Sequence, residues 1–286
     1  MNNKPRARQH VAHPKLAMIS MMLGAFVGMF SETSLNIALP KLMVAFHLTP
    51  ATIQWLVTGY MLVIGIVLPL SSIISKWFTT RQIVIFGLAD FIVGAVIAAL
   101  ANSFTVLLIG RMIQGIGTGL ILPLMFAVVL QIFPPQKIGA VMGMCALVIM
   151  FAPAIGPTLT GLILAKLSWR WVFWVLVPVL AIALIFAITS LENVGQLTKP
   201  HVDVLSIIES AVGCSGLVVG ASLASRDGWL SAPVLTSLIV GVVVIAFYVH
   251  RQLHLETPIL NLKVFKTPAF QSATQRMIFS LAFICY

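Results

Sequence analysis

Long runs of apolar residues follow one another along the whole chain, separated by short segments that contain charges, prolines or glycines. A bilayer core of about 30 Å requires about 20 residues of helix to cross it. The runs predict eight membrane-spanning helices, at residues 16–38, 53–75, 83–101, 105–131, 138–165, 171–190, 204–224 and 232–250. A further apolar segment from Met277 to Tyr286 is too short to cross. The pattern therefore predicts an all-α polytopic membrane protein whose sequence is cut off inside a ninth helix.

Two more polar stretches divide the predicted spans into groups, and both are expected on the cytoplasmic side. We expect six segments in chain order: a cytoplasmic tail at 1–15, a six-helix bundle at 16–190, a cytoplasmic linker at 191–203, a two-helix hairpin at 204–250, a cytoplasmic loop at 251–275 and the truncated start of a ninth helix at 276–286.

Composition excludes an ordinary soluble domain, because 60% of residues are apolar and only 8% are charged, where about a quarter charged is usual. The 17 Lys and Arg against 7 Asp and Glu do not indicate a nucleic-acid partner, since the cations lie at the ends of apolar runs and form no dense basic face. They are typical topology signals, and cytoplasmic connections carry the excess of Lys and Arg.

Counting these cations predicts a multi-pass protein of the cell membrane with its N-terminus in the cytoplasm. Four of them fall on the predicted outer side: Lys41, Lys166, Arg170 and Arg226. Twelve fall on the predicted inner side: Lys4, Arg6, Arg8, Lys15, Lys76, Arg81, Lys137, Lys199, Arg251, Lys263, Lys266 and Arg276.

The remaining chemistry of the sequence points away from catalysis. Cys145, Cys214 and Cys285 are widely spaced, so neither a disulfide framework nor a metal site is expected. We find no nucleotide-binding loop, nucleophile elbow or zinc pattern in the sequence. We therefore expect a protein that is not an enzyme, that uses no cofactor, and that is not driven by ATP.

Four ionisable residues lie inside predicted spans, where a charge costs several kcal/mol and marks a candidate functional site. Glu32 is surrounded by Ser31, Thr33, Ser34 and Asn36, so a carboxyl that exchanges protons or neutralises a cationic substrate is favoured over one that only caps a helix end. Arg111 cannot titrate, so it either holds an acid, a carbonyl or water in place or extends to the interface.

The other two ionisable residues are less informative. Asp90 either pairs with Arg111 or solvates a helix face. Glu209 lies early in its span, and a position near the cytoplasmic surface without a function is favoured.

Glycine and proline patterns predict close packing and one bend. The pairs Gly24 and Gly28, Gly115 and Gly119, Gly139 and Gly143, and Gly216 and Gly220 have the spacing that lets helix backbones approach. The fifth span concentrates helix-breaking residues in its middle, which predicts a bend or hinge there; they are Pro153, Gly156, Pro157 and Gly161.

Three segments together resemble major facilitator superfamily drug:proton antiporters. The run from Glu32 through Asn36 to Pro40 is similar to that family's first-helix signature, and the segment from Leu108 through Arg111 and Gln114 to Gly119 is similar to its fourth-helix motif. The segment from Ala152 through Gly156 and Pro157 to Gly161 resembles its fifth-helix antiporter motif. The extra hairpin resembles the fourteen-helix branch, and the Ser-Glu-Thr version of the first motif is similar to lincomycin-resistance-type multidrug exporters.

The sequence also departs from the family pattern. The acid that would latch the cytoplasmic gate between the second and third helices is replaced by Lys76, so that latch cannot be carried over. In the fifth-helix motif, Ala152 replaces the first glycine and Thr160 replaces one of the last two.

The resemblance implies a function for the full-length parent: export of amphipathic or cationic drugs in exchange for protons, driven by the proton gradient. It implies that Glu32, Arg111, Asn36, Gln114 and Asp90 serve proton coupling or substrate binding, and that Gly156, Pro157 and Gly161 form a conformational hinge. The expected partners are the lipid bilayer, drugs and protons. Two alternatives stay open: a proton-coupled metabolite transporter on the same scaffold, and an inactive fragment or half-transporter that pairs with a separately encoded C-terminal half.

Overall fold

The computed structural model describes residues 14–193 and 203–255, and in these ranges the chain is built of helices. The first four spans are α1 (Pro14–Phe46), α2 (Pro50–Ile53) with α3 (Trp55–Trp77), α4 (Thr80–Ala99) and α5 (Phe104–Ile132). The next four are α6 (Pro135–Lys166), α7 (Trp171–Trp174) with α8 (Leu176–Ser190), α9 (Val204–Asp227) and α10 (Ala232–His254).

Eight helical segments in the described ranges are long and apolar enough to cross a membrane. They coincide with the eight predicted spans to within three residues at most ends, although α1 extends eight residues and α10 four residues beyond the predicted C-terminal ends. The all-α, polytopic membrane class is therefore confirmed. The predicted ninth segment, 276–286, lies outside the described residues.

Helix ends follow local sequence signals. Thr79 forms a capping box with Gln82 at the start of α4, because each side chain accepts a hydrogen bond from the other residue's backbone N–H. Ser103 caps α5 in a simpler way, by accepting a hydrogen bond from the backbone N–H of Val106. Gly228 has φ +80° directly after α9, and it begins the turn into α10.

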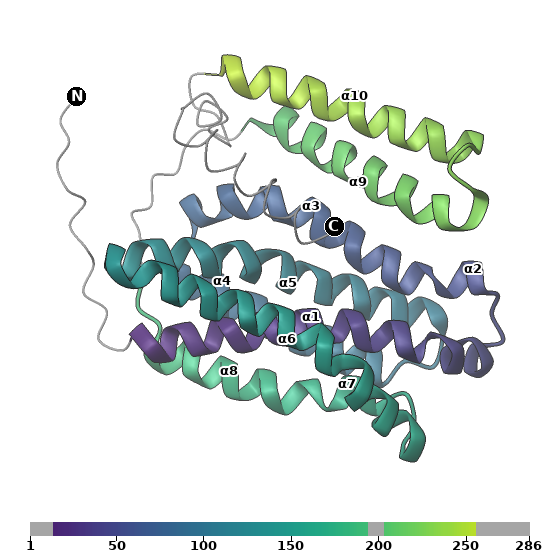
Figure 1. Cartoon of the computed structure of the whole chain (residues 1–286), viewed down its shortest axis with the longest axis horizontal. Coiled ribbons are helices and arrows are strands. Elements are labelled where there is room, and N and C mark those ends of the chain that lie inside the picture. Colours follow the sequence, from purple (N-terminus) through teal and green to yellow (C-terminus); the bar gives the residue numbers. More distant parts are fainter. Residues whose placement is uncertain (1–13, 194–202, 256–286) are drawn as a thin grey trace, which may run out of the picture.

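Successive spans run in opposite directions, so each end of the bundle collects particular helix ends (Figure 1). We call the end where α1 begins and α3 finishes the first end, and the opposite one the second end. In the six-span bundle, α5 packs against α3 and α4, while α1 packs against α5, α6 and α8. The α9–α10 hairpin lies along one edge of the bundle and contacts it mainly through α9 against α3.

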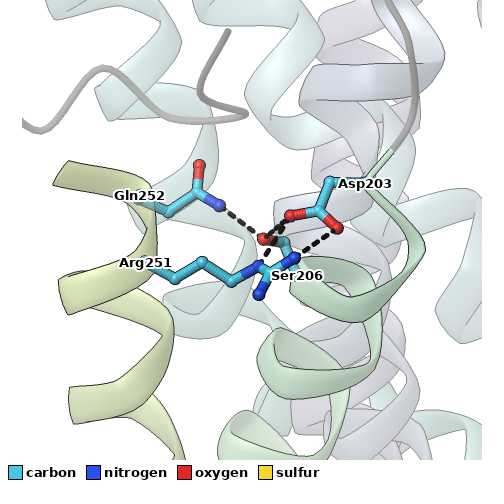
Figure 2. Close-up of polar contacts among 4 residues, drawn as sticks. All are labelled: Asp203, Ser206, Arg251 and Gln252. Carbon is cyan, nitrogen blue, oxygen red and sulfur yellow. Dashed lines mark hydrogen bonds and ion pairs between the residues drawn. The ribbon is translucent and has the colours of Figure 1, made fainter. Parts of the chain in front are cut away.

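A two-point ion pair joins the beginning and the end of the α9–α10 hairpin at the first end (Figure 2). Asp203 precedes α9, and Arg251 lies in the last turn of α10. Arg251 donates from Nε to Asp203 Oδ2 at 2.8 Å and from Nη2 to Oδ1 at 3.1 Å, and we call this contact the Asp203–Arg251 clamp. Ser206 Oγ donates to Asp203 Oδ2 at 2.7 Å, and Gln252 Nε2 donates to Ser206 Oγ at 2.8 Å. The bonds from Arg251 and Ser206 lower the pKa of Asp203 to about 2.

Glycines allow the closest helix contacts. A Cβ on Gly28 would stand 2.9 Å from the Thr118 side chain, and one on Gly216 would stand 2.9 Å from the Gly241 Cα across the hairpin. Three of the four predicted glycine pairs lie at such contacts. The fourth pair, Gly139 and Gly143 on α6, has no other atom within 4 Å of an added Cβ in the described structure.

Helix α6 is the least embedded part of the bundle. Only one stripe of its side chains is buried, namely Cys145, Ala152, Gly156, Thr160 and Leu164. Large apolar residues on its other faces are exposed, including Leu147 and Met150 at 70% each. The helix remains continuous through Pro153 and Pro157.

Candidate functional site

A completely buried arginine lies where α1, α3 and α5 meet. Arg111 on α5 donates hydrogen bonds from Nη1 to Ser31 Oγ at 2.6 Å and to Gln114 Oε1 at 2.7 Å. Its guanidinium carbon stands 4.0 Å from the centre of the Tyr60 ring on α3. Neutral hydroxyl, amide and aromatic groups therefore hold this cation, and the alternative in which it extends to the interface is excluded.

The Tyr60 ring lies against one face of the Arg111 guanidinium and is itself held by hydrogen bonds. The ring is fully buried, and its hydroxyl lies 3.1 Å from the Gly28 carbonyl oxygen and 2.8 Å from Thr118 Oγ1. A cation over an aromatic face is attracted by the ring quadrupole, more strongly where water is excluded. Sequence reasoning missed Tyr60, whose only signal is a polar hydroxyl inside an otherwise apolar span.

Several polar atoms around Arg111 have no hydrogen-bond partner among the described residues. They are Arg111 Nε and Nη2, Gln114 Nε2 and Ser34 Oγ, and all four are buried. Unpaired buried donors are costly, and they favour an acceptor or a negative charge nearby. The site is therefore built to interact with an anion or a hydrogen-bond acceptor.

Glu32 on α1 is partly buried and interacts electrostatically with Arg111. No ion pair within 4.0 Å joins the two side chains in the part of the chain that the structure describes. Asn36, one turn further on, is exposed and donates from Nδ2 to the Glu32 backbone oxygen at 3.3 Å. The structure thus places Glu32 within the electrostatic field of Arg111 without neutralising it by contact.

Asp90 does not pair with Arg111 in this structure. Its Oδ2 instead accepts a hydrogen bond from the backbone N–H of Gly117 at 3.1 Å, which ties α4 to α5. Neither of the two roles considered for Asp90, an Arg111 partner or a carboxylate that only solvates a helix face, describes this contact.

The predicted hinge residues differ in their surroundings. Gly156 on α6 lies directly against Thr33 of α1, and a Cβ there would collide with Thr33 Oγ1. Gly161 has open space around an added Cβ within the described structure. Gly156 therefore contacts Thr33, the residue after Glu32 in α1, whereas the hinge role of Gly156, Pro157 and Gly161 stays a prediction. Glu209 lies apart from this site, in the α9–α10 hairpin.

Comparison with known proteins identifies the family. The family model described as Major Facilitator Superfamily matches residues 21–285. This chain belongs to the Major Facilitator Superfamily.

Among curated members of the Major Facilitator Superfamily, lincomycin resistance protein LmrB of Bacillus subtilis (strain 168) is 54% identical over 255 residues, covering 88% of this chain and 53% of LmrB. Multidrug resistance protein 3 of the same organism is 28% identical, covering 92% of this chain and 51% of the relative. The chain therefore spans about half the length of these relatives. The eight long apolar helices of the described ranges agree with a multi-pass membrane protein of this family.

Solved structures of other transporters share the fold. A peptide transporter POT in complex with sulfate has a TM-score of 0.60 at 16% identity, covering 82% of this chain and 52% of that one. The human organic anion transporter MFSD10 has a TM-score of 0.58 at 16% identity, covering 78% of this chain and 59% of that one.

Proposed function

We propose that this chain forms part of a transporter that exports amphipathic drugs in exchange for protons. Support for the drugs comes from the 54% identity to lincomycin resistance protein LmrB and from the multidrug resistance protein among the relatives. Support for an apolar substrate also comes from the composition, which is 60% apolar with 13 methionines and 17 phenylalanines. No cofactor is needed, since the proton gradient supplies the energy.

The observation that carries the proton coupling is the fully buried Arg111, which interacts electrostatically with Glu32 but forms no ion pair with it. In a medium of low dielectric such an interaction is strong and depends on whether Glu32 is charged. Glu32 alternates between a protonated state and an anion that attracts a cationic drug. Arg111 favours the anion and so promotes proton release. Gln114 orients the guanidinium of Arg111, and Asn36 binds the backbone of Glu32 one turn away.

The transport cycle requires a second bundle. Transporters of this superfamily rock two halves about a central site, and the chain spans about half the length of its curated relatives. We infer that further helices, on the same polypeptide or as a separately encoded C-terminal half, complete the carrier. Six spans followed by the α9–α10 hairpin support the fourteen-helix branch. The excess of Lys and Arg on one side supports an N-terminus in the cytoplasm.

The test is lincomycin efflux in everted membrane vesicles that contain the chain alone or the chain extended to the length of its relatives, with and without a proton gradient. We expect gradient-dependent efflux from the extended form. Glu32→Gln in that form should abolish this efflux, and Glu32→Asp should retain part of it. Glu192→Gln, which removes a carboxylate outside the spans, serves as the control. Unchanged efflux in both Glu32→Gln and Glu32→Ala would refute the coupling role. Gradient-driven uptake of a polar solute would favour the metabolite transporter.

A further inference from the structure

A carboxylate lies inside the close contact between α4 and α5. Asp90 Oδ2 accepts a hydrogen bond from the backbone N–H of Gly117 at 3.1 Å. Gly117 is in the interior of α5, where each N–H is normally used by the carbonyl four residues earlier. The helix therefore does not need the carboxylate to complete its own hydrogen bonds, and the bond serves the contact between α4 and α5.

Glycines on either side of Asp90 bring the two backbones together. Gly87 lies nearly one turn before Asp90 on α4 and Gly94 one turn after it, so the three residues share one face. A Cβ on Gly117 would collide with the Gly87 carbonyl oxygen, and one on Gly94 would stand 2.7 Å from the Gly110 carbonyl oxygen. The Asp90 side chain is thus fixed between two points of backbone contact.

The same face of α4 supports the side chain that holds Arg111. A Cβ on Gly94 would stand 2.8 Å from Gln114 Cγ, so Gln114 lies directly against α4. Gln114 Oε1 in turn accepts the hydrogen bond from Arg111 Nη1 at 2.7 Å. Gln114 precedes Gly117 by three residues, which is about one turn of α5. Asp90 and Gly94 therefore contact the two ends of a single turn of α5.

No opposite charge accounts for the position of Asp90. Arg111 is the one cation on α5, and its hydrogen bonds go to other residues. Among the other helices packed against α4, α7 and α8 contain no titratable residue, and those of α3 are Tyr60 and Lys76. Tyr60 binds elsewhere, and Lys76 lies in the last turn of α3. In the described ranges Asp90 forms no ion pair, so its bond to α5 is its only polar contact there.

We propose that Asp90 is a positioning residue for Arg111, because its bond to the α5 backbone keeps Gln114 in place beside the guanidinium. Among the described residues Arg111 has only two hydrogen-bond acceptors, so a small movement of Gln114 removes one of them. Without the Asp90 bond, Arg111 is held less firmly and acts less strongly on Glu32. The acceptor oxygen of Asp90 performs this role, not its negative charge. The inference rests on the proposed coupling of Arg111 to Glu32.

A lipophilic carbodiimide tests this role without transport, because it modifies protonated carboxyl groups within a membrane. Membranes that contain the chain are labelled over a range of pH, and mass spectrometry of the peptides separates the label on Glu32 from that on Asp90 and Glu209. Arg111 favours the Glu32 anion, so a less firmly held Arg111 should let the label persist to higher pH. We expect Asp90→Ala to raise the midpoint pH of Glu32 labelling by about half a unit.

Two variants separate this role from its alternatives. Asp90→Asn loses the charge but keeps a carbonyl oxygen that accepts the Gly117 bond, so it should not raise the midpoint. Ile121→Val weakens another part of the α4–α5 contact, where Ile121 packs against Gly87, so it should lower stability and leave the midpoint unchanged. If Asp90 acted on Glu32 through its own charge, Asp90→Ala and Asp90→Asn would both lower the midpoint, because an anion would have been removed.

Arg111→Gln tests the route of the effect. In that background Asp90→Ala should cause no further shift, because the guanidinium through which it acts is gone. An equal shift in both backgrounds, a midpoint that Asp90→Ala does not raise, or one that Asp90→Asn raises as much would overturn the proposal. If Arg111→Gln raises the midpoint and Asp90→Ala does not, the coupling of Arg111 to Glu32 stands and only the role of Asp90 fails. A midpoint that Arg111→Gln leaves unchanged would refute the coupling and this inference together.

Discussion

The buried guanidinium of Arg111 defines the site at the scale of single residues. A charge with no exposed surface is normally paired with an opposite charge, since desolvation alone costs several kcal/mol. Arg111 is instead held by a hydroxyl, an amide and an aromatic face. Its charge therefore acts on Glu32 from a distance, and anything that shifts the guanidinium changes that action.

Tyr60 should determine how firmly Arg111 is held. We expect Tyr60→Phe to lower the stability of the folded protein by about 1–2 kcal/mol, because it loses the hydroxyl contacts to Gly28 and Thr118 but keeps the ring. Tyr60→Leu should cost about 2 kcal/mol more, because the cation–π contact is lost as well. Thermal unfolding of the purified variants in detergent measures both losses of stability. Equal stabilities of the two variants would show that the ring contributes nothing to holding Arg111.

The sequence identified the charged members of the site but not their neutral partners. Glu32, Asp90 and Arg111 stand out because charges are rare in apolar runs. Ser31 and Tyr60 do not stand out, since which face of one helix meets which face of another depends on rotation about the helix axes. Spans that are apolar on every side contain little information about that rotation. The same reason explains why the hydrogen bond from Gly117 to Asp90 was not foreseen.

At the scale of elements, Gly156 lies at the contact of α6 with α1. Gly156→Ala should destabilise the protein by about 1–3 kcal/mol, because the new methyl group overlaps Thr33 Oγ1. Gly161→Ala, on the same helix, has open space and should be neutral or slightly stabilising. The matched pair is compared by thermal unfolding.

A second substitution tests the cause of this difference. Thr33→Ala removes the atom that Gly156→Ala would strike, so the double variant should recover most of the lost stability. If the double variant is no more stable than Gly156→Ala alone, the cost arises from the flexibility of α6 around Pro153 and Pro157 and not from the contact with α1.

The Asp203–Arg251 clamp predicts how the stability of the hairpin depends on pH. The pKa of Asp203 is about 2 in the folded protein, against about 3.9 for an unfolded aspartate. A lowered folded-state pKa gives stabilisation that is complete above about pH 5 and is lost progressively as the pH falls toward 2. The wild type should therefore exceed Asp203→Asn in Tm by about 2–4 °C at neutral pH, as expected for a pair worth about 1 kcal/mol.

Thermal unfolding over a pH series measures this difference. The difference in Tm between the wild type and Asp203→Asn should stay constant from neutral pH to about pH 5 and become smaller below pH 4. Arg251→Lys keeps the charge but loses the two-point contact, so its Tm should lie between those of the two proteins. A gap that widens as the pH falls would contradict the clamp.

At the scale of the whole molecule, the number and order of the spans could be predicted, but their arrangement could not. Each apolar run of about 20 residues produced one helix or one pair of consecutive helices, because backbone groups in lipid must satisfy their own hydrogen bonds. The position of the α9–α10 hairpin beside α3 rests on contacts between side chains of the two elements, including the hydrogen bond between Thr58 and Ser222 at 2.5 Å. Contacts between residues so far apart in sequence leave no periodic signal.

Orientation in the membrane is the property of the whole molecule that the charge count predicts most directly. Twelve cations against four predict that the first end, and with it the N-terminus, lies in the cytoplasm. Phe78 lies in the connection at the first end and Leu230 in the connection at the second end, and both are exposed, at 52% and 88%. Single cysteines at these two positions, with Cys145, Cys214 and Cys285 replaced by alanine, report the two sides separately.

Intact cells treated with a membrane-impermeant maleimide should label Leu230→Cys and leave Phe78→Cys unlabelled, whereas everted vesicles should give the opposite result. Equal labelling of both positions in intact cells would indicate mixed orientation, which the strong asymmetry of Lys and Arg argues against. The reversed pattern would place the first end outside. The Asp203–Arg251 clamp would then face the exterior, and Glu32 would meet protons from the opposite side of the membrane.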